Sequence, residues 1–258
     1  MTQDRRVAIV TGGGRGIGRA IALRMARGGD DLVLAGLEPD ELRATAAEVE
    51  RLGRRALAVV ADVARDDQVQ ALVERSRVAL GPIDILVNNA AIIGPTASVE
   101  RVLRADWDEV LAVNLTGAWL CCRAVLPEMI ARRAGKIINI ASMAGKIAYP
   151  LRSPYAVSKW GLIGLTLTLA QEVGAYGIQV NAVCPGPVEG ERMRRIIADR
   201  AEALGQAPEQ IERAYVEPAA LKRMARAEDV AALVAFLTSP EADNITGQAI
   251  DISAGYRL

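Results

Sequence analysis

Tyr155 and Lys159 lie four positions apart in the stretch SPYAVSKWGL, in a chain that contains no histidine. The absence of histidine excludes Ser-His and Cys-His activation of a nucleophile, imidazole ligands for a metal and an imidazole general base. A phenol can move protons instead if its pKa falls from about 10 toward 7, which needs roughly 4 kcal/mol of preference for the phenolate. A lysine ammonium one helical turn away shifts the tyrosine pKa in that direction. Seen alone, such a pair is usually a packed ring beside a solvated charge, so its meaning depends on its setting.

The glycine-rich stretch TGGGRGIG, residues 11–18, follows an apolar run and precedes a segment of helical period. A tight turn in this position presents backbone N–H groups and a helix N-terminus to a phosphate, and larger side chains would block the approach. The spacing of the glycines differs from GxGxxG, but the strand–turn–helix context is the one that a dinucleotide site requires. We therefore expect a pyrophosphate to bind at Gly12, Gly14, Arg15, Gly16, Ile17 and Gly18.

The choice between NAD and NADP depends on the residues after the second strand, where an acid bonds the ribose diol or a basic residue accepts a 2′-phosphate. Here the chain reads LAGLEPDEL, in which Leu37 offers neither group. Glu38 would repel a phosphate, whereas Arg15 in the glycine turn would attract one. The sequence therefore favours NAD, with NADP as the alternative.

Apolar runs and segments of helical period alternate along the chain. The runs lack the alternation of half-exposed strands, so they indicate strands buried on both faces of a parallel sheet, covered by helices. We predict an α/β fold, a Rossmann-type doubly wound parallel sheet of about seven strands in three αβα layers, formed as a single domain by residues 1–258. The predicted strands are residues 6–11, 31–36, 55–61, 83–89, 135–142, 177–186 and 247–253, and the predicted helices are residues 17–28, 38–53, 66–81, 105–133 and 153–177.

The segment from Gly190 to about Leu221 interrupts this alternation. It is charged, has helical period and is followed by no strand. We interpret it as an insertion of one or two amphipathic helices. Placed beyond the carboxyl end of a strand, such an insertion covers the region where ligands bind in open α/β sheets, so we expect a lid over the substrate.

The composition limits the partners and the compartment. The 31 basic and 31 acidic residues cancel, so no strong net field directs the protein to nucleic acid or to an anionic membrane. The N-terminus lacks the features of a signal peptide, and no apolar run of membrane-spanning length is evident. Cys121, Cys122 and Cys184 form no CxxC motif and indicate buried small hydrophobes. We expect a cytoplasmic protein that acts on a small molecule, without a metal, a nucleic acid or a membrane as partner.

Taken together, the motifs resemble those of the short-chain dehydrogenase/reductase family over essentially the whole chain. The matching motifs are TGGGRGIG at 11–18, Asp62-Val63, NNAA at 88–91, VNLTG around Asn114, Ser142, YxxxK at 155–159 and Pro185-Gly186. The resemblance implies a catalytic tetrad of Asn114, Ser142, Tyr155 and Lys159. It also implies further cofactor contacts at Asp62, Val63, Asn89, Ala90, Tyr155, Lys159, Pro185, Gly186 and Val188, beside those at Leu37, Glu38 and the glycine turn.

Each member of the tetrad has an implied role. Tyr155 transfers the proton, and Lys159 lowers the pKa of the phenol and bonds the nicotinamide ribose. Ser142 holds the substrate oxygen, and Asn114 anchors a water that leads from Lys159 to solvent. At Gly190 this sequence departs from the family, which often has a threonine there against the nicotinamide carboxamide. We therefore expect the backbone around Val188 to hold that group.

Three segments are expected to wall the substrate pocket: residues 93–96, 144–152 and 189–195. Their candidate substrate contacts are Ile93, Ala144, Tyr149, Arg152, Glu189 and Arg192. The polar members suggest a hydroxylated or anionic, sugar-like alcohol. The same side chains are equally compatible with facing solvent or pairing with each other.

The reaction that the resemblance implies is interconversion of a secondary alcohol and a ketone by hydride transfer. One alternative is a 3-oxoacyl-[acyl-carrier-protein] reductase with Arg132 and Arg133 as docking residues, although Gln171 stands where those reductases often have an arginine. Another is a non-catalytic nucleotide-binding regulator, against which the presence of both Tyr155 and Lys159 argues. The resemblance further implies a homotetramer or homodimer formed through the helices of Asn114 and Tyr155 and through the C-terminal strand. The candidate contacts there are Trp119, Leu120, Leu165 and Leu169.

Overall fold

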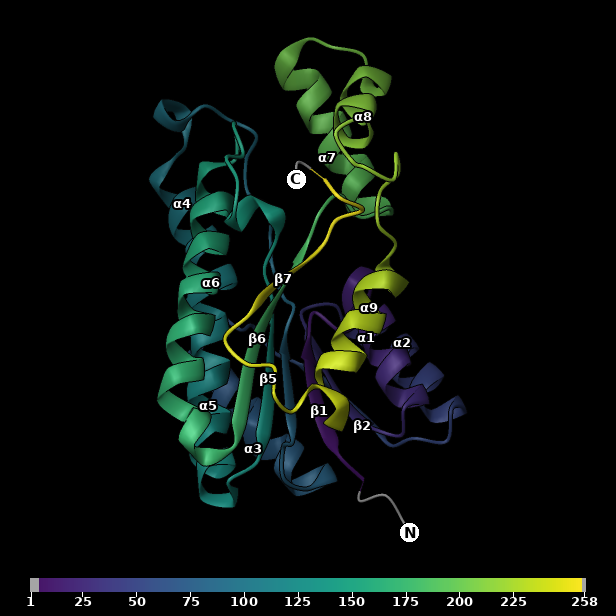
Figure 1. The fold of residues 1–258 in the computed structure, drawn as a ribbon, viewed down its shortest axis with the longest axis vertical. Helices are drawn as coiled ribbons and strands as arrows, with labels where there is room; N and C mark the ends of the chain where they lie inside the picture. The colour runs from purple at the N-terminus through teal and green to yellow at the C-terminus, as the bar shows by residue number, and fades with distance from the viewer. Residues whose placement is uncertain (1–4, 257–258) are drawn as a thin grey trace.

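Seven apolar runs form the strands of one parallel sheet in the computed structural model, which describes residues 5–256 (Figure 1). Neighbouring strands pair in the order β3-β2-β1-β4-β5-β6-β7, and every pairing is parallel. The predicted Rossmann-type doubly wound sheet is thereby confirmed. The strands are β1 (Val7–Thr11), β2 (Asp31–Gly36), β3 (Ala56–Val60), β4 (Ile85–Asn88), β5 (Gly135–Ile140), β6 (Ile178–Pro185) and β7 (Ala249–Ile252).

The strand order reverses next to β1, which pairs with β2 on one side and with β4 on the other. At such a switch point the loops after the two strands diverge and leave a crevice at their carboxyl ends. The glycine-rich stretch follows β1 and the NNAA stretch follows β4. Strand order therefore brings these two motifs to the same crevice.

Helices cover both faces of the sheet (Figure 1). The helices α1 (Gly16–Arg27), α2 (Pro39–Arg51) and α9 (Ala227–Leu237) lie on one face, and α3 (Asp66–Leu80), α5 (Gly117–Arg132) and α6 (Ser153–Val173) lie on the other. Each interface holds its own apolar core. Because both faces are covered, the alternate side chains of the central strands are buried in one core or the other, whereas the edge strands β3 and β7 are partly exposed. Short 3₁₀ turns occur at Val99–Arg101, Met143–Gly145, Gly174–Tyr176 and Pro240–Ala242.

The long helix predicted for residues 105–133 is divided in the structure. It begins as α4 (Arg104–Leu111), passes through a π-helical turn at Ala112–Thr116 and continues as α5. Asn114 lies in that turn, and its side chain bonds both the N–H and the carbonyl of Ile92. The wider turn thus lets a helix residue satisfy a loop backbone, a long-range contact that hydrophobic period does not encode.

The same stretch has the length and composition of a membrane span, contrary to our expectation that no such run is present. It covers Arg104–Arg132, and 44% of its most apolar window is buried. Leu120, Cys121 and Val125 are buried in the core between the helices and the sheet. These contacts are those of a core helix.

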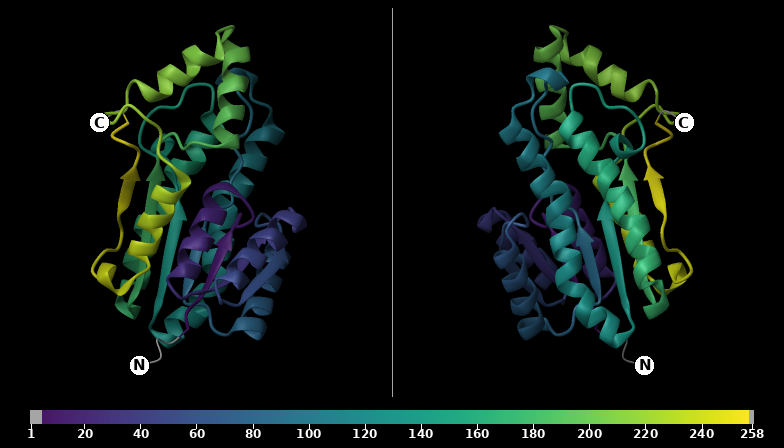
Figure 2. Two further views of the ribbon diagram at one scale, coloured as in Figure 1. Left: turned by 90° about the vertical axis from the view of Figure 1, so that its right-hand side faces the viewer. Right: turned by 90° about the vertical axis from the view of Figure 1, so that its left-hand side faces the viewer.

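Two further helices, α7 (Glu191–Leu204) and α8 (Pro208–Val216), lie beyond the carboxyl ends of the strands (Figure 2). They form the expected insertion and share an apolar cluster of Met193, Ile196, Ile197, Ala201, Ile211, Tyr215, Ala219, Met224 and Tyr256. The two ends of the insertion are held together, because Ala225 N donates to Pro187 O at 2.9 Å and Glu189 N donates to Ala225 O at 2.9 Å. We call residues 190–221 the lid.

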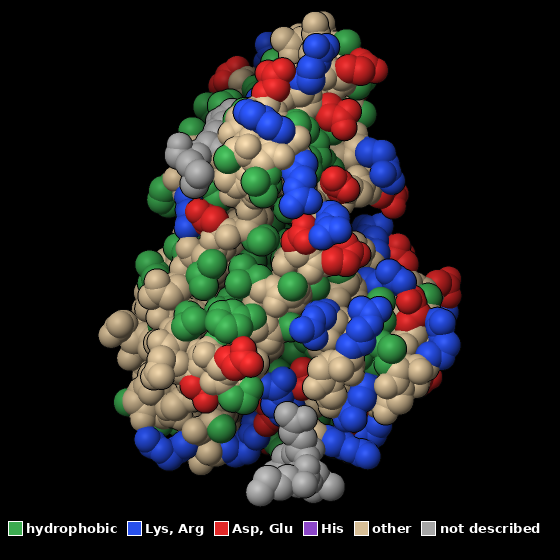
Figure 3. Space-filling view, turned by 45° about the vertical axis from the view of Figure 1, so that its right-hand side comes forward, with side chains coloured by type: hydrophobic (Ala, Val, Ile, Leu, Met, Phe, Trp, Pro, Cys, Tyr) green, Lys and Arg blue, Asp and Glu red, His purple; other side chains and the backbone are tan. Residues whose placement is uncertain are grey.

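Acidic and basic side chains are interspersed on the face that Figure 3 shows, both over the lid at the top and over the lower part of the molecule. Both signs of charge occur over the lid and over the lower part of that face, in keeping with equal numbers of basic and acidic residues in the chain. This distribution gives no extended field for a polyanion on this face.

Candidate active site

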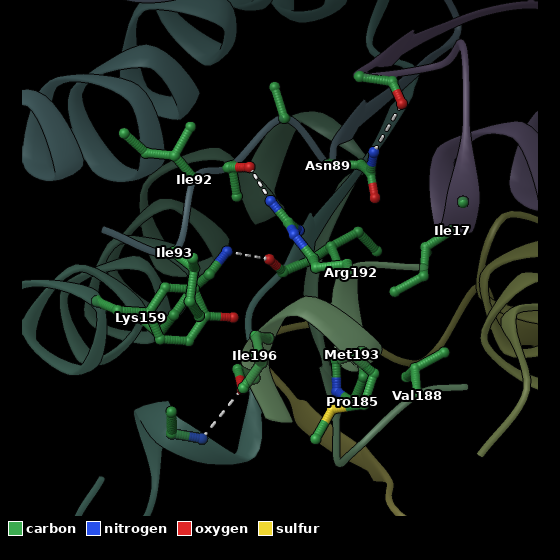
Figure 4. A pocket seen from close by; sticks show the side chains of 18 of the residues that line it. Ile17, Asn89, Ile92, Ile93, Lys159, Pro185, Val188, Arg192, Met193 and Ile196 are labelled. Atoms are coloured by element: carbon green, nitrogen blue, oxygen red, sulfur yellow. Dashed lines mark hydrogen bonds between the residues drawn. The ribbon is translucent and has the colours of Figure 1, made fainter. Parts of the chain in front are cut away.

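A cavity of about 1120 Å³ runs along the carboxyl ends of the strands, from the glycine turn to the lid (part of it in Figure 4). All the sequence-predicted cofactor contacts line this cavity. Ser142, Tyr155 and Lys159 of the predicted tetrad line it too, as do five of the six substrate candidates: Ile93, Ala144, Tyr149, Glu189 and Arg192. Asn114 and Arg152 lie outside the lining.

The glycine turn approaches the NNAA stretch closely. A side chain at Gly12 would meet Asn89 Nδ2 at 2.9 Å, and one at Gly18 would meet the carbonyl oxygen of Gly12 at 2.0 Å. Gly12 also has a φ of +62°, which disfavours other residues. Since α1 begins at Gly16 with no acidic residue in its first turn and no side-chain cap, its first N–H groups are free to bind an anion.

Asn89 and Thr11 hold the turn in place. Asn89 Nδ2 donates to the carbonyl oxygens of Thr11 and Gly12 at 2.9 and 3.1 Å. The hydroxyl of Thr11 accepts from the backbone N–H groups of Asn89 and Ala90, each at 3.0 Å. The cradle that fits a pyrophosphate is therefore already formed without it.

At the end of the cavity where the adenosine of the cofactor is expected, beside the glycine turn, most of the charged side chains are acidic. Arg15 Nη1 lies 3.4 Å from Glu41 Oε1, so the one basic side chain of the glycine turn has a carboxylate partner. Glu38 stands exposed beside it, and Leu37 is 62% exposed. Asp62 uses one carboxylate oxygen to accept from Ala64 N at 2.9 Å.

Three members of the predicted tetrad converge on the middle of the cavity. Ser142 lies two residues after the end of β5, and its hydroxyl accepts from Ala144 N at 3.1 Å. Tyr155 and Lys159 come from the first turns of α6, where Pro154 occupies a position that needs no backbone N–H. Lys159 Nζ lies 5.7 Å from the centre of the Tyr155 ring and donates to the carbonyl oxygen of Ile140 at 2.7 Å.

Lys159 is held in an environment that disfavours its charge. Burial, and then the positive charge of Arg192, lower the pKa of Lys159 to about 7. Figure 4 shows Arg192 reaching between Asn89 and Lys159, where its guanidinium donates to the carbonyl oxygen of Ala91. An anion or a hydrogen-bonding ligand placed here would restore the ammonium form of Lys159.

Asn114, the fourth member, is buried at 2% exposure beneath the cavity floor. Its Nδ2 donates to the carbonyl oxygen of Ile92 at 2.9 Å and to Ser158 Oγ at 3.0 Å, and its Oδ1 accepts from Ile92 N at 2.8 Å. Both amide protons are therefore already engaged by the protein.

Arg152, expected to contact substrate, instead lies behind the cavity wall at 1% exposure. Its Nη1 donates to the carbonyl oxygen of Gly94 at 2.5 Å, and its Nη2 lies 3.7 Å from Asp199 Oδ2. A side chain at the residue before α6 points back under the loop after β4, because the bridge between Ala97 and Arg152 fixes the direction of the chain there.

Several lining residues come from the lid and were not among the predicted contacts. They include Ile196, Arg200, Ile211, Tyr215 and, from the C-terminal segment, Tyr256, whereas Met193 falls within the predicted wall segment 189–195. The helical period of the lid would have separated its apolar face from its charged face. It could not show which way that face points, since orientation depends on where the insertion crosses the sheet.

A buried polar ladder lies below the site and was also missed. Asn88 Nδ2 donates to Asn139 Oδ1 at 2.9 Å, and Asn139 Nδ2 donates to Thr166 Oγ1 at 2.9 Å. The ladder links β4, β5 and α6, the three elements that carry the NNAA stretch, Ser142 and Tyr155. The asparagines within otherwise apolar strands were the available signal for it.

Three further expectations concern residues away from the site. The cysteines are free and buried, and burial raises the pKa of Cys122 to about 12 and that of Cys184 to about 11. Within residues 5–256, no group of three or more potential metal ligands is assembled.

The proposed docking arginines do not lie at the mouth of the cavity. Arg132 and Arg133 precede β5 and lie at the amino ends of the strands, opposite the cavity. There, Arg132 pairs with Asp84 at 2.8 Å and Arg133 bonds the carbonyl oxygen of Ala175 at 2.7 Å.

Comparison with known proteins identifies the family. The short chain dehydrogenase family model matches residues 6–201. A short-chain dehydrogenase/reductase of Armillaria gallica is 40% identical over 254 residues, covering 97% of this chain and 95% of the relative. The 3-oxoacyl-[acyl-carrier-protein] reductase of Staphylococcus epidermidis is 37% identical over 253 residues, covering 97% and 98%.

Solved structures agree with this. NAD⁺-bound xylitol dehydrogenase superposes with a TM-score of 0.94 at 32% identity, covering 97% of this chain and 98% of that one. Actinorhodin polyketide ketoreductase with NADPH gives a TM-score of 0.94 at 33% identity, covering 99% and 98%. The chain belongs to the short-chain dehydrogenase/reductase family, as its motifs indicated, and is an oxidoreductase of the nicotinamide-dependent kind.

Proposed function

We propose that the protein interconverts a secondary alcohol and a ketone with NAD as cofactor, and that Tyr155 transfers the proton. The observation that carries the proposal is the convergence of Ser142, Tyr155 and Lys159 on one cavity that also contains the glycine turn. The free N–H groups of α1 and the close-packed glycines fit a dinucleotide pyrophosphate. When bound there, the nicotinamide supplies the acceptor or donor for the hydride.

The chain itself moves the proton and holds the substrate oxygen. In oxidation, the Tyr155 phenolate takes the hydroxyl proton as the carbinol hydrogen leaves with its electron pair. In reduction, the phenol returns that proton to the oxygen. Ser142 retains its hydroxyl proton for the substrate oxygen, since its Oγ acts only as an acceptor toward Ala144 N.

Lys159 and Asn114 act behind the phenol in this proposal. An ammonium at Lys159 stabilises the phenolate of Tyr155, 5.7 Å from the ring centre. The side-chain amide of Asn114 is already bonded to Ile92 and Ser158. We therefore assign the water that carries the proton to the backbone carbonyl of Asn114, which lies in the π-helical turn. We expect the carboxamide to be held by the backbone around Val188.

Preference for NAD is proposed from the charges at the adenosine end. A 2′-phosphate would face Glu38 and Glu41, and Arg15 is already paired with Glu41 at 3.4 Å. Like charges this close disfavour a dianionic phosphate, although solvent screens exposed groups.

The test combines cofactor and mutant kinetics. Purified enzyme is assayed with NAD and NADP on a panel of hydroxy acids, polyols and simple cyclic alcohols. We expect kcat/KM to favour NAD, and Tyr155→Phe to bind NADH as the wild type does while losing roughly 10³-fold or more in kcat, the range of an essential proton-transfer group. Turnover of Tyr155→Phe at the wild-type rate would refute the proposed proton donor, and a tenfold preference for NADP would refute the proposed cofactor.

The carrier-protein reductase alternative is supported by the relative from Staphylococcus epidermidis. The two arginines suggested as docking residues, Arg132 and Arg133, do not support this alternative, because they lie at the amino ends of the strands, away from the cavity. We therefore place the small-molecule alcohol first. Reduction of a 3-oxoacyl thioester with higher kcat/KM than any member of the alcohol panel would reverse this order.

A further inference from the structure

Two phenol groups from different segments meet at the lid side of the cavity. Tyr149 precedes α6, Tyr215 belongs to α8, and their hydroxyl oxygens lie 2.9 Å apart. Both side chains line the cavity. The Tyr149 ring also packs edge-on against Tyr155, with 6.2 Å between ring centres and 63° between planes. The phenol pair is therefore next to the reaction centre, on the side where substrate must lie.

One hydroxyl proton of the pair is left over. Two phenols carry two O–H donors, and the single hydrogen bond between them uses one. No second partner for either hydroxyl occurs within residues 5–256. Burial, and then the neighbouring Tyr215, raise the pKa of Tyr149, so that phenol stays protonated at neutral pH. A donor is thus available to a ligand in the cavity.

Positive charge surrounds the pair. The Arg200 guanidinium lies 5.9 Å from the centre of the Tyr149 ring, lines the cavity and makes one contact of 3.3 Å to the carbonyl oxygen of Pro150. It forms no ion pair with any described residue. Arg152 lies behind Tyr149 and has an Nη2 that is buried and lacks a hydrogen-bond partner. Asp199, which precedes Arg200 in the chain, already faces Arg152 at 3.7 Å.

These groups offer a phenol donor and positive charge, and their only acceptors are the phenol oxygens. A guanidinium has five N–H groups and accepts nothing, whereas a carboxylate accepts only. A sugar hydroxyl, which donates as well as accepts, is matched less well by such a set. Beside the pair, the cavity wall is apolar and consists of Ile93, Ile147, Met193, Ile196 and Ile211.

We propose that Tyr149, Tyr215 and Arg200 form a subsite that binds a carboxylate of the substrate, so that the enzyme acts on hydroxy acids and oxo acids with an apolar carbon skeleton. The inference rests on the proposed function for its reaction, and it narrows the substrate class. Tyr215 and Arg200 are then specificity-determining residues contributed by the lid.

The kinetic test uses a matched pair of ketones, 3-oxocyclohexanecarboxylate and 3-methylcyclohexanone, which differ by a carboxylate in place of a methyl group. We expect wild-type kcat/KM for the acid to exceed that for the methyl analogue by about tenfold or more, as a charge-assisted contact provides. In Tyr215→Phe and in Arg200→Gln this ratio should fall by about tenfold through KM for the acid. The methyl analogue should change by less than about threefold.

Two variants serve as matched controls. Arg194→Gln removes an exposed arginine from α7 that does not line the cavity, and Tyr176→Phe removes a phenol hydroxyl at the opposite edge of the sheet. Both should keep the wild-type ratio. Because Arg200 is partly exposed, we expect Arg200→Gln to fold. This variant therefore still tests the subsite if Tyr215→Phe fails to fold.

A binding experiment separates this inference from the proposed reaction. Cyclohexanecarboxylate and its neutral methyl ester are titrated calorimetrically into the cofactor-bound enzyme. Binding of the acid that weakens about tenfold in Arg200→Gln supports the subsite even if no alcohol or ketone is turned over, in which case the proposed function fails alone. Turnover of both ketones with a ratio that neither variant alters would overturn the subsite and leave the proposed function intact.

Discussion

The function proposed for Lys159 requires a charged ammonium, whereas the surroundings of this side chain disfavour its charge. As an ammonium it would stabilise the phenolate of Tyr155, yet it is 3% exposed and shares the cavity with the guanidinium of Arg192, so its pKa falls to about 7. Without ligands, the neutral amine of Lys159 is therefore far more accessible at neutral pH than that of an exposed lysine. Ligand groups that accept hydrogen bonds or carry negative charge beside Lys159 would couple their binding to uptake of a proton.

This coupling has a measurable consequence for stability. In the unfolded chain a lysine stays protonated to a pKa of about 10.4, whereas folded Lys159 loses its proton near 7, so the unfolded state binds more protons between these values. Stability from this group must therefore rise with pH across that window. Relative to Lys159→Met, cofactor-free wild type should gain about 2 kcal/mol, or roughly 4 °C in melting temperature, between pH 7 and 9.

Thermal unfolding of both proteins at the two pH values checks this. Lys222→Met removes an exposed lysine and serves as the control for losing the side chain. A constant difference between wild type and Lys159→Met at pH 7 and 9 would contradict the lowered pKa.

At the scale of elements, the buried ladder of Asn88, Asn139 and Thr166 sets the relative positions of β4, β5 and α6. Asn139 is fully buried, and its amide accepts from one neighbour and donates to the other. Removing it leaves Asn88 Nδ2 with only its longer contacts to Ala118 O at 3.4 Å and Cys122 Sγ at 3.3 Å, and leaves Thr166 Oγ1 without a donor. A buried unsatisfied polar group costs about 1–3 kcal/mol.

We therefore expect Asn139→Leu to lower the free energy of unfolding by about 1–3 kcal/mol and to reduce kcat, since Ser142 and Tyr155 lie on the elements that the ladder joins. Urea denaturation with Thr166→Val and the double variant tests the connection. The two losses should be less than additive, because both variants break the same bond. Strict additivity would show that the residues do not act as one ladder.

Some elements were predictable from sequence and others were not, for physical reasons. The seven strands are apolar because both faces of the sheet are covered, so their composition alone reveals them. The break at Ala112–Thr116 depends on Asn114 reaching Ile92, a contact 22 positions away. Arg152 looked like a substrate ligand because its neighbours line the cavity, but the Ala97 bridge turns it inward. The glycine turn was predictable because it follows a strand and opens a helix, whereas Ser142, Tyr155 and Lys159 were predictable because their order and spacing resemble the motifs of the family.

At the scale of the whole molecule, an apolar surface remains on the helices that carry the site. Val157 and Trp160 of α6 are 44% and 53% exposed, and with Leu115 they line a shallow apolar groove. Of the residues expected at a subunit contact, Leu120 and Leu169 are instead buried in the chain's own core, while Trp119 is 42% exposed. We propose that this surface is covered by a second copy in a homodimer or homotetramer.

Light scattering of the purified protein tests the assembly. We expect a dimer or tetramer for the wild type and a smaller species for Trp160→Glu, because a buried charge at the contact lacks a partner. Val78→Glu, at a 74% exposed valine on α3, is the matched control and should leave the mass unchanged. A monomeric wild type would refute the proposed contact.

The hydrogen bonds that hold the two ends of the lid together affect how the substrate specificity of such a protein can change. Because Pro187 and Glu189 are bonded to Ala225, the end of β6 and the start of α9, between which the lid is inserted, lie side by side. A segment anchored in this way can change length or sequence with only a small entropic cost of closure, since its ends are already together. Residues 190–221 form an exchangeable cassette in this sense. New substrates could then be acquired by replacing the cassette, while the dinucleotide half of the molecule and its chemistry stay the same.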